Sequence, residues 1–115
     1  MRTGGRQLTG WKAIAALPHA VVAAPSPAYQ NMIFGGDDGA LASQTMQLKE
    51  NHPGFSNQIL KYDDLTDKWE LMDTVQKLPV TTTMVQWNGQ LVIPGGEIRP
   101  AKRTNTVLIA KPCNK

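Results

Sequence analysis

Three side chains near the end of the sequence, Glu97, Arg99 and Arg103, carry its most useful chemistry. A positioned carboxylate can take a proton from a hydroxyl group, which is the task of a general base. A guanidinium can bind a carboxylate through two parallel hydrogen bonds. Residue type alone assigns neither role, because glutamate and arginine side chains are usually solvated. The sequence also leaves open which arginine would hold an anion.

Composition narrows the classes of ligand. The chain has 115 residues and a net charge of +3, and 41% of its residues are hydrophobic, which is typical of one globular domain. The stretch 74–115 has six basic side chains and Glu97 as its single acid. Its basic cluster is short and lacks interleaved aromatic residues, so we expect an anionic small ligand and no nucleic acid. No stretch reaches the ~18 apolar residues of a membrane span, so we expect no membrane partner.

The single cysteine, Cys113, permits no intramolecular disulfide and no zinc site built from thiolates. Cysteine usage therefore leaves the redox compartment, whether periplasm or cytoplasm, undetermined. The stretch from Arg2 to Ala28 imitates a signal peptide only loosely, because Pro18 and His19 interrupt its apolar part.

Three landmarks occur twice, about sixty residues apart: Trp11 and Trp69, Leu17-Pro18 and Leu78-Pro79, Gly35-Gly36 and Gly95-Gly96. A di-glycine after an apolar strand, with a tryptophan closing each unit, is typical of one blade of a Kelch-type β-propeller. We therefore expect an all-β fragment of about two four-stranded antiparallel blades. The expected units are 1–19 (outer strand of a preceding blade and linker), 20–72 (first blade) and 73–115 (second, incomplete blade).

Short apolar or alternating segments that end in turn residues predict the strands. They are 20–24, 31–34, 58–62, 68–72, 81–87, 90–93 and 105–111. Asn88-Gly89 predicts a two-residue hairpin turn, and 63–67 predicts a turn rich in aspartate. We expect the polar stretch 37–56 to be a loop without helix that lies over one blade face.

The segment 11–14 corresponds to 69–72, which closes the first blade. It therefore offers the outer strand that the last blade lacks, in a ring or in another copy of the chain. Unpaired sheet edges attract partners, so self-association through blade edges is expected.

The stretches 23–28, 34–39, 59–69 and 79–104 resemble the later blades of the Kelch-repeat N-acetylneuraminate epimerases, or sialic acid mutarotases. The most specific match is 96–104, which fits that family's Gly-Glu-x-x-Pro-x-x-Arg-Thr pattern. The resemblance implies that Glu97 is the proton acceptor and that Arg103 lies beside it, with Arg103 or Arg99 holding the substrate's carboxylate.

The same resemblance implies an isomerase that interconverts the anomers of a sugar acid without metal or organic cofactor. Such propellers have about six blades around a channel, so we expect this chain to be a fragment. The alternative is a non-catalytic Kelch binding module, because fold does not fix function. Of the remaining residues, His52 is expected to be an exposed loop histidine rather than an acid, and Trp11 and Trp69 are expected to pack between blades.

Overall fold

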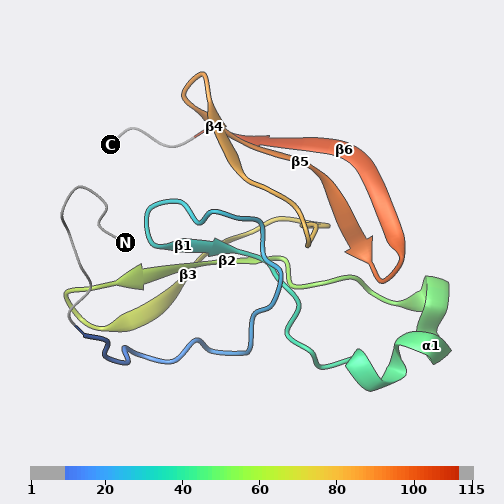
Figure 1. The fold of residues 1–115 in the computed structure, drawn as a ribbon, viewed down its shortest axis with the longest axis horizontal. Coiled ribbons are helices and arrows are strands. Elements are labelled where there is room, and N and C mark those ends of the chain that lie inside the picture. Colours follow the sequence, from blue (N-terminus) through green and yellow to red (C-terminus); the bar gives the residue numbers. More distant parts are fainter. Residues whose placement is uncertain (1–9, 112–115) are drawn as a thin grey trace.

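The computed structural model describes residues 10–111, which form two three-stranded antiparallel sheets (Figure 1). The first sheet has the order β1-β2-β3 and the second the order β4-β5-β6. The strands are β1 (Met32–Phe34), β2 (Gln58–Asp63), β3 (Lys68–Thr74), β4 (Val85–Trp87), β5 (Gln90–Arg99) and β6 (Lys102–Ala110). The predicted all-β architecture of two blade-like antiparallel sheets is confirmed.

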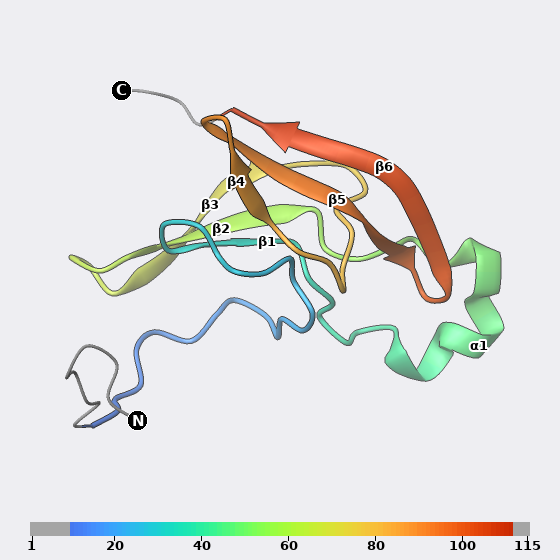
Figure 2. The same cartoon turned by 45° about the horizontal axis from the view of Figure 1, so that its top comes forward.

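The two sheets pack on a common core. Figures 1 and 2 show the second sheet lying across the first. Buried side chains from both sheets and from the segment before β4 form one cluster: Phe34, Ile59, Leu78, Met84, Leu91 and Ile93. Their burial is the main force that holds the sheets together.

Backbone hydrogen bonds also join the two units. The N–H of Thr81 donates to the carbonyl of Ala23 at 2.8 Å, and the N–H of Met84 donates to the carbonyl of Ser26 at 2.8 Å. A parallel bridge pairs Ser26 with Thr83. The segments 23–26 and 81–84 hold matching places in the two units, so the repeat pairs with itself at this junction.

The sequence repeat is a backbone repeat. Val22 and Asp37 exchange two hydrogen bonds of 2.9 Å, and Val80 and Glu97 exchange two of 2.8 and 2.9 Å. The residue after each valine has a positive φ, 62° at Ala23 and 55° at Thr81. This geometry aligns Val22 with Val80, so Ala20-Val21 takes the place of Leu78-Pro79. The match of Leu17-Pro18 with Leu78-Pro79 is therefore displaced by three residues.

The second glycine of each di-glycine lies where a side chain would collide. A Cβ at Gly36 would lie 2.6 Å from Cγ1 of Val21, and one at Gly96 would lie 2.8 Å from Cβ of Pro79. Both glycines have positive φ, 96° and 116°. Only glycine combines this backbone conformation with so close an approach of neighbouring chain.

The predicted hairpin turn at Asn88-Gly89 is confirmed, with φ of 57° and 76°, as a type I′ turn requires. The first unit has the same turn at Gln30-Asn31, with φ of 47° and 63°, which the sequence prediction missed. Asparagine tolerates the left-handed region, so this pair needs no glycine. The matching turns give Tyr29 the place in the first unit that Trp87 has in the second.

One predicted strand, 20–24, is wrong, and another, 81–87, is too long. The segment 20–24 makes only the Val22–Asp37 bridge, and the strand predicted over 81–87 begins at Val85. The positive φ of Ala23 and Thr81 interrupts each extended run. The prolines at 25 and 27 also lack the N–H that a ladder needs. The first sheet therefore has three strands and not four.

The segments after the two di-glycines differ. The prediction of no helix in 37–56 is wrong: short helical turns occur at Ala42–Gln44, Thr45–Leu48 (α1) and Lys49–Asn51. In the second sheet β5 continues past Gly95-Gly96 with a register shift and turns back at residues 100–101 into β6. A short hairpin here replaces the long loop of the first unit.

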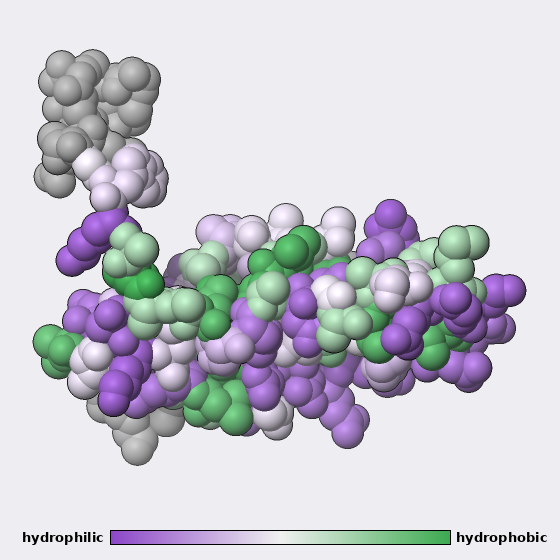
Figure 3. Space-filling model, turned by 90° about the horizontal axis from the view of Figure 1, so that it is seen from below, coloured by the Kyte–Doolittle hydropathy of each residue, from purple (hydrophilic) through white to green (hydrophobic). Residues whose placement is uncertain are grey.

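The segment before the first sheet is tied at one point. The N–H of Ala15 donates to Oδ1 of Asp67 at 2.8 Å, and Nε1 of Trp69 donates to the carbonyl of Ala15 at 2.9 Å. Tyr62 packs on Trp69 and donates its hydroxyl to Asp67 at 2.7 Å. Trp11 is 88% exposed, so its predicted packing role is wrong. Figure 3 shows the first described residues of this segment, at the upper left, standing off the body of the molecule.

Gly96→Ala is expected to lower the free energy of unfolding by about 2–3 kcal/mol, because it adds both a collision and backbone strain. Gly39→Ala is the matched control, since Gly39 also has positive φ but open space around its Cβ position. The control is expected to cost about 1 kcal/mol. Urea denaturation of both variants measures the difference, and equal losses would contradict the collision.

The Tyr62–Asp67 contact makes the tether sensitive to pH. The hydrogen bond to Asp67 raises the pKa of Tyr62 to about 12, and the bonds from Tyr62 and Ala15 lower the pKa of Asp67. The tether's contribution to stability is therefore lost as pH rises toward 12, through Tyr62, and as pH falls through the lowered pKa of Asp67.

We expect the phenolate absorbance of a Tyr29→Phe protein, which retains one tyrosine, to titrate near pH 12 and to move toward pH 10 when Asp67→Asn is added. Asparagine accepts a hydrogen bond without the negative charge. The titration is read where circular dichroism remains native, and an unchanged midpoint in Asp67→Asn would contradict the assignment.

Candidate functional site

The β5–β6 hairpin brings Glu97 and Arg103 together. The two residues are direct cross-strand partners. Side chains of such partners project from the same face of the sheet, with their Cβ atoms about 5 Å apart. The hairpin turn before β6 includes Ala101, with φ of 63°. A carboxylate and a guanidinium that are six positions apart in the sequence thus lie on neighbouring strands.

The backbone of Glu97 is fixed from both sides. Its N–H and carbonyl bond to Val80, and its other side faces Arg103 across the hairpin. Glu97 is half-buried and Arg103 is exposed. Between residues 10 and 111 the structure records no hydrogen bond to the Glu97 carboxylate. Asp37, which has the matching place in the first unit, accepts the N–H of Gly39 at 2.9 Å.

Arg99 does not join this pair. It lines a hollow of about 500 Å³ between the end of β5 and the loop that follows α1, together with Ile98 and His52. Its guanidinium reaches the carbonyl of Lys49 over 3.5 Å. Neither Glu97 nor Arg103 lines this hollow. Because a register shift lies between Glu97 and Arg99, the strict alternation of side chains is broken there.

His52 is buried, with 8% of its surface exposed, so its interpretation as an exposed histidine is wrong. Its Nδ1 accepts the N–H of Gly54 at 3.0 Å, which places the proton of the neutral ring on Nε2. The ring lies 5.6 Å from that of Phe55. The Pro53-Gly54 turn was the sequence signal for this contact, because the N–H of Gly54 requires an acceptor and the ring of His52 can supply one. His52 and Arg99 thus form a second polar site that sequence reasoning missed.

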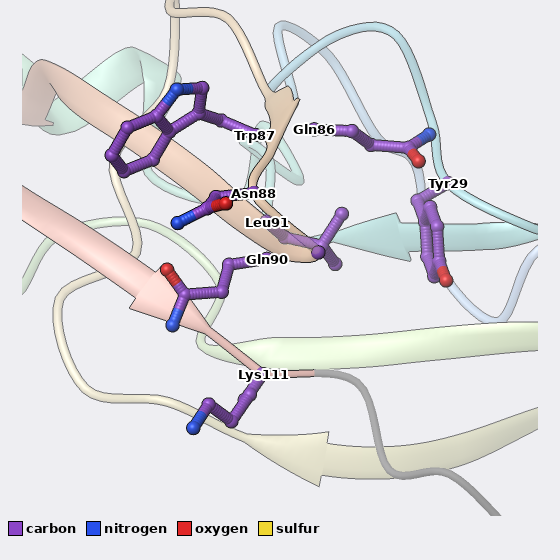
Figure 4. A pocket seen from close by; sticks show the side chains of 8 residues that line it. Tyr29, Gln86, Trp87, Asn88, Gln90, Leu91 and Lys111 are labelled. Atoms are coloured by element: carbon purple, nitrogen blue, oxygen red, sulfur yellow. The ribbon is translucent and has the colours of Figure 1, made fainter.

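A hollow of about 560 Å³ lies at the β4–β5 turn, away from Glu97. Figure 4 shows Gln86 and Tyr29 on one side of β4 and Trp87 on the other. The rest of its lining is mixed, with the polar or basic side chains of Asn88, Gln90 and Lys111 beside Gly89 and the apolar Leu91. It contains no carboxylate, so it offers no side-chain base of the kind that Glu97 provides.

Within residues 10–111 there is no group of three His, Cys, Asp or Glu side chains that could hold a metal ion. No helix in this range is long and apolar enough to cross a bilayer. Scans against protein-family models and against curated proteins found no match to this chain. The candidate site is therefore defined by its own geometry, the Glu97–Arg103 pair.

His52→Ala is expected to lower the free energy of unfolding by about 1–3 kcal/mol, because it leaves the partly buried N–H of Gly54 without a partner. His52→Asn is the matched variant, since an asparagine oxygen can accept the same N–H, as Asp37 accepts that of Gly39. Chemical denaturation is expected to show a smaller loss for His52→Asn. Equal losses would mean that ring packing, and not the hydrogen bond, holds the turn.

Proposed function

We propose that this chain is the catalytic-hairpin part of a Kelch-type propeller that interconverts the anomers of N-acetylneuraminate. One observation carries the proposal: Glu97 and Arg103 are cross-strand partners on one face of the β5–β6 hairpin. The resemblance of residues 96–104 to the mutarotase pattern names the same two residues. The backbone repeat supports a propeller as the setting for the pair.

In this proposal Glu97 takes the proton of the anomeric hydroxyl. The bond between the anomeric carbon and the ring oxygen breaks, the ring oxygen takes a proton from solvent water, and the anomeric carbon becomes a planar ketone. After rotation, the hydroxyl formed from the ring oxygen attacks the other face of the ketone and returns its proton to solvent, while the ketone oxygen takes back the proton held by Glu97. Arg103 holds the substrate's carboxylate, which fixes the anomeric carbon beside Glu97.

A binding function without turnover is the second candidate. Arg103 is exposed, and the hairpin face that it shares with Glu97 is formed by one sheet alone. Catalysis needs water excluded and the substrate held from several sides. Binding of a sugar acid by the basic hairpin needs less enclosure.

Conversion of the α-anomer of N-acetylneuraminate, followed by proton NMR, tests the catalytic proposal. We expect the chain to accelerate the conversion, and Glu97→Gln to reduce the acceleration by at least about 100-fold. Arg103→Gln is expected to raise the half-saturating concentration roughly tenfold, because a charged hydrogen bond is lost.

Lys102→Gln is the control, because it removes a neighbouring charge on the same hairpin without touching the pair. It should leave the rate unchanged. Acceleration that survives Glu97→Gln would defeat the assignment of the base. Saturable binding without acceleration would favour the binding module.

A further inference from the structure

The outer edge of the second sheet is unoccupied by any described strand. β6 lies at the end of the order β4-β5-β6, and in the first sheet the equivalent strand, β2, is covered by β3. β6 is 9 residues long. A long open edge presents a row of unpaired N–H and carbonyl groups, which favours the addition of another strand.

The sheet face beside this edge is apolar and exposed. Val107 and Ile109 of β6 are 53% and 57% exposed, and Trp87 of β4 is 62% exposed. Val85, Val92 and Ile109 are aligned across the three strands. Such a row is costly to leave in water, because each side chain keeps its apolar surface hydrated.

The segment Trp11–Ile14 has what this edge lacks. It resembles the start of β3, with a tryptophan in the same place, and it is exposed at both ends, 88% at Trp11 and 48% at Ile14. It pairs with no strand in the described structure. In the first sheet the corresponding Trp69 lies opposite Tyr62 of β2.

The same chain cannot bring its own segment to β6. Ala15 is bonded to Asp67 and Trp69 at the far side of the first sheet. Figures 1 and 2 place the first sheet between this segment and the second sheet. Four residues span at most about 14 Å when fully extended. A Trp11–Ile14 segment that reaches β6 must therefore belong to a second copy of the chain.

We propose that Trp11–Ile14 of a second copy adds to the outer edge of β6 as a fourth antiparallel strand. Phe34 and Pro94 each precede a di-glycine, so the pair Phe34–Ile59 of the first sheet corresponds to the pair Pro94–Val107 of the second. Ala110 of β6 therefore has the place that Tyr62 has in β2, and the β2–β3 register gives the register of the proposed pairing. Trp11 then lies opposite Ala110, beside the hollow of about 430 Å³ that Tyr29, Leu91 and Lys111 line. Ile14 lies on the outer face near Val107.

Light scattering over a concentration series tests the association. The wild-type chain is expected to reach the mass of at least two chains at high micromolar concentration, and Trp11→Glu to remain at one. Met46→Glu is the control, because Met46 is 84% exposed on α1, which lies near the start of β6 and not at its 107–110 end (Figures 1 and 2). A wild-type mass of one chain at every concentration, or association unaffected by Trp11→Glu, would overturn the proposal.

Disulfide trapping tests the register. In a Cys113→Ser background, Trp11→Cys with Ala110→Cys is expected to give intermolecular disulfides, because their Cα atoms fall within about 7 Å in the proposed pairing. Trp11→Cys with Thr106→Cys is the control, since Thr106 lies about 13 Å further along the strand. Equal trapping by both pairs, or none by the first, would overturn the register.

Discussion

The close approach of each di-glycine to the chain before it is the constraint on which this structure depends. Val80 and Glu97 can exchange their two hydrogen bonds only because Gly96 has no Cβ. That contact pairs the end of β5 with the segment around Val80, and the β5–β6 hairpin follows directly after it. The same contact at Gly36 shapes the first unit, but a long loop follows it. The same backbone contact is therefore followed by a hairpin with a candidate site in the second unit and by a loop with short helical turns in the first.

Much of the fold could be predicted from local patterns. Asn88-Gly89 and the aspartate-rich turn before β3 are short-range signals, and the apolar alternation of β2, β3 and β5 has period two. The two di-glycines made the repeat recognisable, because the positive φ of these positions favours glycine. Residues 20–24 look like a strand by composition, yet the positive φ of Ala23 breaks it. That angle is set by the pairing with 81–84, which no local pattern contains.

The candidate site was predictable in part. The resemblance of 96–104 pointed to Glu97 and Arg103. Their pairing depends on the length of the β5–β6 turn, which the alternation of apolar and polar residues does not determine. Arg99 was grouped with them by sequence proximity, but the register shift after Glu97 separates it. His52 was missed because its burial depends on the end of β5, which is far from it in the sequence, as well as on the nearby Phe55.

The central claim is that the face shared by Glu97 and Arg103 binds a sugar acid. The most direct measurement is a titration of the isotope-labelled chain with N-acetylneuraminate, followed through its backbone amide resonances. The account predicts saturable shifts centred on Gly96, Glu97 and Arg103, which Arg103→Gln weakens. Shifts centred instead on His52 and Arg99, or no saturable shifts, would contradict it.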